Sequence, residues 1–232
     1  MENFEIHFYM ASPIAFGYRK PFAPLMLDGL LTWMLKGNAI REDELPDVPL
    51  PLEQSGDKYP YYHASAWELV NPKFGTFCFV KSKPDDWAKR FLKTKPMLEI
   101  INYIATPEVI FRARGSRSDV HKIVASTGGS ISLGSKRVAG WGRVNNIRIS
   151  DPLPEDYSVW DQYGRAARPI PVTEIPPEKV KGGIVLMPYK PPYWTGEKIP
   201  CLVPPLERWW PGISEESIAE LENKLKRLEQ AE

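Results

Sequence analysis

Residues 108–149 read EVIFRARGSRSDVHKIVASTGGSISLGSKRVAGWGRVNNIRI, and this stretch decides the fold. Apolar and polar residues alternate over Glu108–Arg114, which predicts a strand, and Asp119–Ala125 has the spacing of a short helix. A glycine-rich loop, residues 128–143, then leads into a second alternating run, Arg143–Ile149. The stretch therefore predicts a strand, a helix, a long glycine-rich connection and another strand.

The N-terminal part of the chain begins with the same order of elements. Apolar residues at every second position of 4–10 predict a strand, and Leu25–Lys36 carries apolar residues at helical spacing. Two further apolar runs, Ser65–Val70 and Gly75–Lys81, predict a β-hairpin. Together these elements form a βαβ–βαβ alternation with an antiparallel hairpin inside. We therefore expect an α+β domain of ferredoxin-like or RRM-like type.

The remaining segments are predicted to be insertions and a C-terminal extension. We expect one domain over residues 1–150, with an inserted acidic, proline-rich loop at about 40–60 and a short helix over Asp85–Lys93. Residues 151–232 are expected to form a proline-rich extension with one more strand, Ile184–Met187. The extension should end in a helix over Ser214–Gln230 whose apolar stripe packs on the same domain.

Positive charge is concentrated in the stretch that decides the fold. Residues 110–148 hold eight lysines and arginines against one acid, Asp119, although the net charge of the whole chain is only +1. Acids that compensate lie early in the chain and near its end. Glycines let backbone amides approach a ligand, so cations beside them favour a polyanion as the partner. The cations within or just after the glycine-rich loop are Lys136, Arg137, Arg143 and Arg148.

Composition and motifs exclude several other classes of protein. Cys78 and Cys201 lie far apart without zinc-binding spacing, so we expect two buried, reduced thiols and neither a metal nor another cofactor. The sequence contains no P-loop, no HExxH motif and no GxSxG motif. It contains no run of about eighteen apolar residues and no signal-like start, so we expect a cytoplasmic protein without a membrane partner.

Three sequence motifs, in this order, resemble a known family. They are ASP at 11–13 followed by PLMLDGLLTWM at 24–34, then GSKRVAGWGRV at 134–144, and ARPIPV at 167–172. Together they resemble the CRISPR-associated RAMP proteins, and more narrowly the type IV effector-complex subunit that caps the 5′ end of the guide RNA. The resemblance covers most of residues 1–190. Trp141 between two glycines and the additional pair at 128–129 depart from the family pattern.

The resemblance implies a ferredoxin-like domain whose inserted segments form a thumb-like projection. The glycine-rich loop and the neighbouring sheet face would hold the repeat-derived 5′ handle of the guide RNA (crRNA), without catalysis. The backbone and large subunits of the effector complex would be the protein partners. Carry-over onto this sequence gives loop glycines and phosphate contacts at Gly134, Gly140, Gly142, Lys136, Arg137 and Arg143. The other candidate RNA contacts are Arg112, Arg114, Arg117, His121, Lys122, Trp141 and Arg148.

The roles of several candidate residues stay open from the sequence. Trp141 either stacks on an RNA base or packs beneath the sheet. Arg112, Arg114 and Arg117 either contact RNA or lie on a solvated strand edge. Asp28 lies inside an apolar helix, where a carboxylate must be paired. We expect it to bond a backbone group or a cation of the proline-rich segments.

The alternative function is a metal-independent endoribonuclease that processes precursor crRNA, because some RAMP relatives cleave such RNA. This reaction needs one group to deprotonate the 2′-hydroxyl, another to protonate the leaving oxygen, and cations at the phosphate. His121, in the basic stretch, is the best candidate base. Tyr61, Tyr62 and His63 form the second candidate group.

Overall fold

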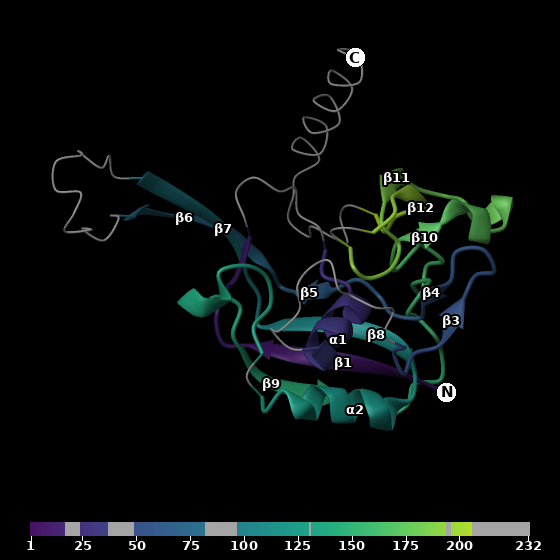
Figure 1. The fold of residues 1–232 in the computed structure, drawn as a ribbon, viewed down its shortest axis with the longest axis horizontal. Helices are drawn as coiled ribbons and strands as arrows, with labels where there is room; N and C mark the ends of the chain where they lie inside the picture. The colour runs from purple at the N-terminus through teal and green to yellow at the C-terminus, as the bar shows by residue number, and fades with distance from the viewer. Residues whose placement is uncertain (17–23, 37–48, 82–96, 130, 194–195, 206–232) are drawn as a thin grey trace, which may run out of the picture.

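The computed structural model describes residues 1–16, 24–36, 49–81, 97–129, 131–193 and 196–205 (Figure 1). The strands are β1 Glu2–Met10, β2 Ile14–Phe16, β3 Gln54–Ser55, β4 Tyr61–Tyr62, β5 Glu68–Val70, β6 Lys73–Lys81, β7 Met97–Ala105, β8 Glu108–Gly115, β9 Val144–Ile149, β10 Ile170–Pro171, β11 Ile184–Met187 and β12 Ile199–Leu202. The helices are α1 Leu27–Lys36 and α2 Arg117–Ser126, with short 3-10 helices η3 Arg137–Ala139, η4 Val172–Glu174 and η5 Pro177–Lys179. The fold is thus α+β, with antiparallel sheets and two α-helices.

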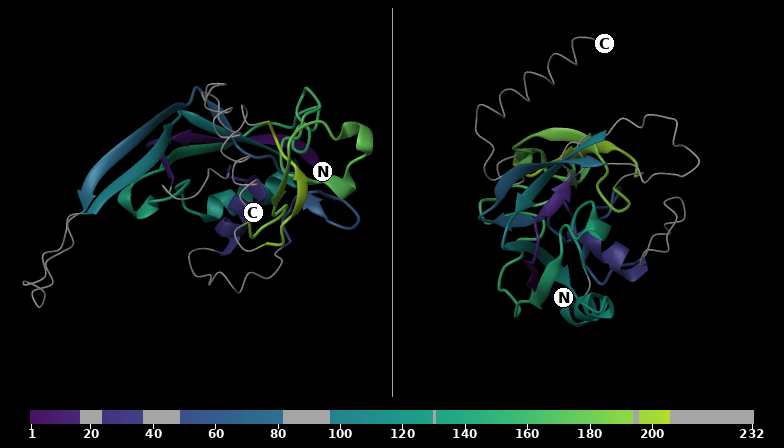
Figure 2. Two further views of the ribbon diagram at one scale, coloured as in Figure 1. Left: turned by 90° about the horizontal axis from the view of Figure 1, so that it is seen from above. Right: turned by 90° about the vertical axis from the view of Figure 1, so that its left-hand side faces the viewer.

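The body of the molecule is a four-stranded antiparallel sheet in the order β5–β8–β1–β9. Both α-helices lie on one face of this sheet (Figure 2). The alternation in β1 sends Phe4, Ile6 and Phe8 to the helix-covered face, where all three are fully buried. Burial of each such side chain contributes about 1.5–3 kcal/mol, so the alternation fixes which face is covered. Their packing partners from β8 and the helices are Leu27, Leu31, Val109, Phe111, Val120 and Ile123.

Most of the predicted elements of this body are confirmed. The strands β1, β8 and β9 and the helices α1 and α2 begin and end within two residues of the predicted positions. Strand β11 has the predicted bounds, Ile184–Met187. The predicted helices over Asp85–Lys93 and Ser214–Gln230 lie outside the described residues, as does most of the acidic stretch of the inserted loop.

The predicted hairpin of Ser65–Val70 with Gly75–Lys81 is wrong. Strand β5 pairs with β8 in the central sheet, whereas β6 pairs with β7 from Lys73 opposite Ala105 to Lys81 opposite Met97. Strand β7 also pairs with β2, which gives a second sheet in the order β2–β7–β6. The β6–β7 hairpin projects from the body (Figure 1). Strands β6 and β7, which follow β5 and precede β8 in the chain, therefore form a long protruding hairpin.

The C-terminal part forms a small third sheet in the order β10–β12–β11, with its own cluster of buried side chains. It lies at the end of the body opposite the projecting hairpin (Figure 1). Arg168, just before β10, joins this part to the body, because its Nη2 lies 3.2 Å from Oδ2 of Asp28 in α1. Of the two partners predicted for Asp28, a backbone group or a cation of the proline-rich segments, the cation is thus confirmed. A domain boundary near residue 150 stays a prediction.

The two cysteines differ in burial. Cys201 lies in the C-terminal cluster, and burial raises the pKa of its thiol to about 11. Cys78 on β6 is exposed, so the expectation of two buried thiols is wrong for Cys78. The exposure of Cys78 follows from its strand, because β6 is part of the hairpin that projects from the body (Figure 1).

Candidate functional site

The glycine-rich loop is anchored to the start of the chain. Its tip is the short helix η3, where Val138 is fully exposed. Because its stem is anchored, the loop presents this tip in a defined position. Four hydrogen bonds anchor the stem: Ser135 N to Ala15 O (2.8 Å), Gly142 N to Pro13 O (2.7 Å), Arg143 N to Ser12 Oγ (2.9 Å), and Ser12 Oγ to Gly140 O (2.8 Å).

The loop glycines fall into two groups. A Cβ added at Gly134 would lie 2.6 Å from the Ala15 carbonyl oxygen, and one at Gly142 would lie 1.8 Å from the Leu133 carbonyl oxygen. Gly140 has the same left-handed backbone, with φ +85°, but a Cβ there would meet open space. Close packing therefore explains the glycines at 134 and 142. Gly140 faces outward, as do Gly128 and Gly129 at the start of the loop, where an added Cβ would also meet open space.

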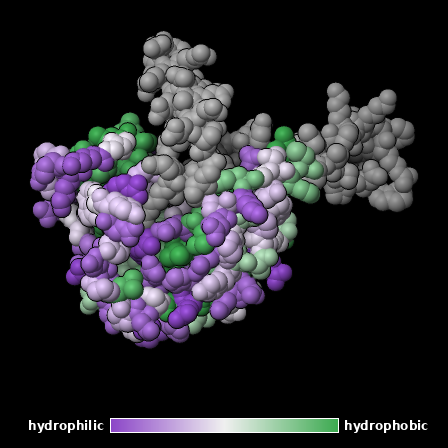
Figure 3. Space-filling model, turned by 180° about the vertical axis from the view of Figure 1, so that it is seen from behind, coloured by the Kyte–Doolittle hydropathy of each residue, from purple (hydrophilic) through white to green (hydrophobic). Residues whose placement is uncertain are grey.

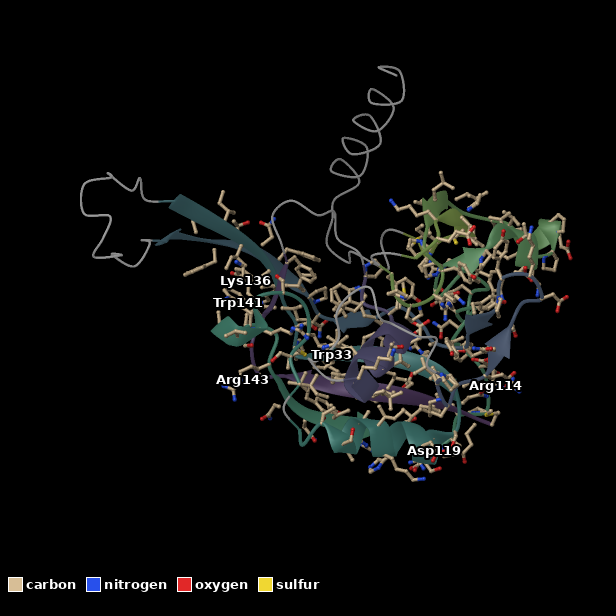
Figure 4. The ribbon with its side chains drawn as sticks, viewed as in Figure 1. Trp33, Arg114, Asp119, Lys136, Trp141 and Arg143 are labelled. Carbon is tan, nitrogen blue, oxygen red and sulfur yellow. The ribbon has the colours of Figure 1, made fainter. Side chains whose placement is uncertain are left out.

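Trp141 lies against the base of the projecting hairpin (Figure 4). Its ring is 5.7 Å from that of Tyr103 on β7 and 6.1 Å from that of Phe77 on β6, both tilted. Trp141 is half-buried against the hairpin and does not pack beneath the central sheet, so that alternative is wrong, while stacking on an RNA base stays a prediction. Phe77 is itself about half exposed, at 49%. The three rings therefore form an aromatic surface that reaches solvent.

Cations of the loop lie beside this aromatic surface. The guanidinium of Arg137 lies 4.9 Å from the ring centre of Trp33 in α1, a cation–π arrangement. Figure 4 shows Lys136 and Trp141 near the base of the hairpin, with Trp33 close by and Arg143 farther away, toward β9. Arg143 is exposed and has no side-chain partner among the described residues. Exposed cations and aromatic rings thus meet at the junction of the loop, α1 and the hairpin.

Arg112 and Arg114 lie elsewhere, on the sheet face that the helices leave open. Arg112 donates to Glu68 and, at 2.9 Å, to Glu5, and Arg114 lies 2.8 Å from Glu53. Seen from behind in Figure 3, the body shows mostly hydrophilic residues. Ion pairs therefore neutralise these two arginines in the free protein, so they are not simply solvated, and their contact with RNA stays a prediction.

Two cations of α2 are also paired. Arg117 donates to the Ser150 carbonyl oxygen at 2.6 Å and lies 3.3 Å from Asp151. Lys122 lies 2.7 Å from Asp119, one turn earlier in the same helix. Both carboxylates are exposed, Asp151 at 92% and Asp119 at 49% of the side chain, so these are surface ion pairs of small energy. The candidate cations are thus divided among the loop tip, the open sheet face and the α2 surface.

The histidine candidates for catalysis lie in two unrelated places. His121 is exposed on α2 and has no side-chain partner among the described residues. His63 is held on both ring nitrogens, by Asp156 Oδ2 and by Ser55 Oγ, each at 2.8 Å, and its side chain is only 13% exposed. Tyr61 and Tyr62 are buried, at 7% and 6% exposure. The second candidate group is therefore a packed polar cluster and lies apart from the loop tip.

The cluster at His63 predicts a pH dependence of stability. Burial raises the pKa of Asp156, but hydrogen bonds from His63 and Ser158 outweigh it and lower the pKa to about 2. This is below the ordinary aspartate pKa of about 3.9, so the stabilisation is present above that pH and is lost as the pH falls toward 2. In urea unfolding, we expect the free-energy difference between wild type and Asp156→Asn to be largest near pH 5 and to shrink toward pH 2.

Asp57→Asn is the matched control, because Asp57 is exposed. Its difference from wild type should stay constant over the same pH range. A constant difference for Asp156→Asn as well would contradict the assigned role of the Asp156 carboxylate.

Comparison with known proteins adds no family assignment. The sequence matches no protein-family model and no curated protein. None of the helices in the described ranges is long and apolar enough to cross a membrane. The function is therefore inferred from the residues of the site.

Proposed function

We propose that this chain is a non-catalytic RNA-binding subunit of a CRISPR effector ribonucleoprotein, similar to the type IV subunit that caps the guide RNA. It binds the repeat-derived 5′ handle of crRNA in the cytoplasm and contacts the backbone and large subunits of the complex. The observation that carries the proposal is the anchored glycine-rich loop, which presents Lys136, Arg137 and Arg143 beside Trp33 and Trp141.

The order of strands supports a ferredoxin-like assignment. Strand β1 is followed by the short β2 and then by α1, and β8 is followed by α2. The sheet order β5–β8–β1–β9 places the first and third strands of the central sheet in its middle. This is the arrangement of a split βαβ unit. The β6–β7 hairpin is inserted between the second and third strands of that unit, β5 and β8. It supports the thumb-like projection that the family resemblance implies.

The chemistry of the loop suits single-stranded RNA. Cations hold phosphates, while unstacked bases lie on aromatic rings or on guanidinium planes. The guanidinium of Arg137 lies over the ring of Trp33, and Trp141 forms the aromatic surface together with Phe77 and Tyr103. A base stacked on such a surface contributes about 1–3 kcal/mol. An RNA strand can therefore be held by its backbone and its bases at the same junction.

The endoribonuclease alternative has less support. His121 is accessible, but no carboxylate orients its ring within the described residues. His63 is oriented by Asp156, yet its second ring nitrogen is already bonded to Ser55. Neither histidine is joined to a second acid–base group with open access to a phosphate. Binding without cleavage is therefore the function that the described residues favour.

The test is RNA binding by the triple variant Lys136→Ala/Arg137→Ala/Arg143→Ala. The probe is the RNA handle identified by sequencing RNA that copurifies with the chain, made synthetically and labelled. Each phosphate contact on a single strand contributes about 0.7 to the slope of log affinity against log salt. We expect binding about 100-fold weaker in about 0.1 M salt and a slope flatter by about 2.

Lys179→Ala/Lys181→Ala/Lys198→Ala is the charge-matched control, because these exposed lysines lie in the C-terminal part. It should bind the probe as wild type does. Equal affinities of the two triple variants would exclude the loop as the RNA site. Cleavage of a labelled precursor RNA in chelator, abolished by His121→Ala, would replace the proposal with the nuclease.

A further inference from the structure

A groove lies between helix α2 and strand β9, beside the candidate site. It has a volume of about 1020 Å³, which is large enough for a short segment of a linear polymer. Figure 1 shows α2 running along β9 at the edge of the central sheet. Aliphatic side chains, among them Val124 and Ile147, form part of the lining. The polar part of the lining includes Arg117, His121, Lys122, Asn145 and Arg148.

The electrostatic character of the groove is positive. Arg148 and His121 are exposed and have no side-chain partner among the described residues. Within the described ranges Lys122 pairs with the exposed carboxylate of Asp119, a contact that water and salt weaken. Glu2 is the acidic residue of the lining. A bound anion therefore meets Arg148 without a competing side-chain partner among the described residues, and Lys122 with only an exposed one.

The groove is continuous with the glycine-rich loop. Gly129, just past the end of α2, lines it, and β9 begins directly after Arg143 of the loop. Strand β9 has six residues at about 3.3 Å each, so it extends on the order of 20 Å from the loop toward the start of α2. The far end is marked by Arg117, whose Nε bonds the Ser150 carbonyl oxygen. A chain held at Arg143 can thus continue along β9 past Arg148, which lies at the rim of the groove because its register with His7 directs its side chain to the face opposite to α2.

The outer edge of β9 carries polar groups that are suited to nucleotides. On its inner edge β9 pairs with β1, and the Ile147 amide is bonded by the side chain of Asn146 at 2.9 Å. Asn145 is exposed in the groove beside these groups. An amide side chain can donate to and accept from base edges, while the aliphatic lining accommodates ribose. This combination fits a nucleotide chain better than an acidic peptide, which offers only carboxylates.

We propose that the α2–β9 groove is a second RNA-binding site, which holds the single strand that continues from the glycine-rich loop. Arg148 and Lys122 contact phosphates, and Asn145 contacts bases or ribose. The inference rests on the proposed function, since it needs an RNA chain at Arg143. It assigns Arg148 and Lys122 a role that they do not have at the loop tip.

The test compares short and long RNA on three charge-reversal variants. Fluorescein-labelled uridine oligomers of about 4 and about 12 nucleotides serve as probes, within the site sizes known for single-strand binders. Arg148→Glu alters the groove and Arg143→Glu alters the loop. Lys198→Glu is the control, an equal change of charge on the exposed C-terminal part. Far-ultraviolet circular dichroism checks that each variant is folded.

Arg148→Glu is expected to weaken binding of the long oligomer about tenfold, to flatten its salt slope by about 0.7, and to leave the short oligomer unchanged. Arg143→Glu should weaken both oligomers. With 4-thiouridine in the long oligomer, wild type should crosslink to peptides of both the loop and β9.

If Arg148→Glu binds both oligomers as Lys198→Glu does while Arg143→Glu binds weakly, the groove is excluded and the proposed function stands. If wild type binds neither oligomer and no copurifying RNA, the proposed function and the groove fail together. A labelled hexaglutamate peptide tests the other class of anion. If wild type binds this peptide, and Arg148→Glu abolishes that binding without changing the affinity for either RNA oligomer, the groove is a site for an acidic peptide and the RNA proposal is overturned.

Discussion

Arg168→Met is expected to lower the free energy of unfolding by about 3–5 kcal/mol, a large part of the stability of a typical domain. Arg168 and Asp28 are both fully buried and form an ion pair at 3.2 Å. Removal of the cation leaves the Asp28 carboxylate charged in an apolar interior, which costs more than the lost attraction. Urea unfolding followed by circular dichroism measures the change.

The surroundings of Arg168 explain why a methionine cannot replace it. Its guanidinium also donates to backbone carbonyl oxygens of three separate segments, so those acceptors lose their donor as well. Burial, and then the Asp28 carboxylate, raise the pKa of the Tyr193 hydroxyl well above its usual value, which keeps that hydroxyl protonated as a donor to Asp28. The carbonyl acceptors belong to Tyr62, Ala64, Pro169 and Tyr189.

Arg112→Met is the matched control, because Arg112 also pairs with two carboxylates but its side chain remains 20% exposed. Water can solvate the carboxylates of Glu5 and Glu68 once Arg112 is removed, so the free energy of unfolding should fall by about 1 kcal/mol or less. The double variant Asp28→Leu/Arg168→Met removes both charges and should recover part of the stability that Arg168→Met loses. Equal losses for Arg168→Met and Arg112→Met would contradict the role given to the buried pair.

The central sheet could be predicted from the sequence because its signals are local. Alternation over residues 4–10 and helical spacing over 25–36 are each contained within one element. That Asp28 is paired, with a backbone group or a cation, also followed from one physical rule, since a carboxylate inside an apolar helix needs a partner. The sequence did not indicate that this partner is Arg168, 140 residues away.

The projecting hairpin could not be predicted in the same way. Glu68–Val70 and Lys73–Lys81 are neighbours in sequence and both have strand composition, so the sequence alone favours pairing these two strands with each other. The true partner of β6 is β7, which lies beyond residues 82–96. Periodicity identifies strands but does not choose between partners, because pairing depends on contacts across the whole chain.

The candidate site was predicted in part. The loop and its cations were identified from the glycines and the local excess of positive charge. A count of charges along the chain, however, contains no information about ion pairs between distant segments. Arg112 meets Glu5 from 107 residues away and Arg114 meets Glu53, so part of the local positive excess is neutralised. The aromatic surface of Phe77, Tyr103 and Trp141 was missed for the same reason, since β6 and β7 were not recognised as partners.

Gly142→Ala is expected to lower the free energy of unfolding by about 3–4 kcal/mol, because an added Cβ would lie 1.8 Å from the Leu133 carbonyl oxygen. No side chain can yield there, since the atom it meets belongs to the backbone. The backbone must move, which breaks the hydrogen bonds from Leu133 N to Gly142 O (2.8 Å) and from Gly142 N to Pro13 O (2.7 Å). Each bond contributes about 1 kcal/mol, and the left-handed backbone of alanine adds about 1–2 kcal/mol.

Gly140→Ala separates the effect of packing from that of backbone conformation. Gly140 has φ +85° and Gly142 has φ +68°, so alanine is strained at both positions, but only Gly142 faces a backbone atom. Gly140→Ala should therefore cost only the conformational part, about 1–2 kcal/mol. Because both bonds lost in Gly142→Ala anchor the stem that carries Lys136 and Arg143, RNA affinity should fall in Gly142→Ala even where the chain remains folded. Equal stabilities for the two variants would show that the stem is not the rigid support that the loop requires.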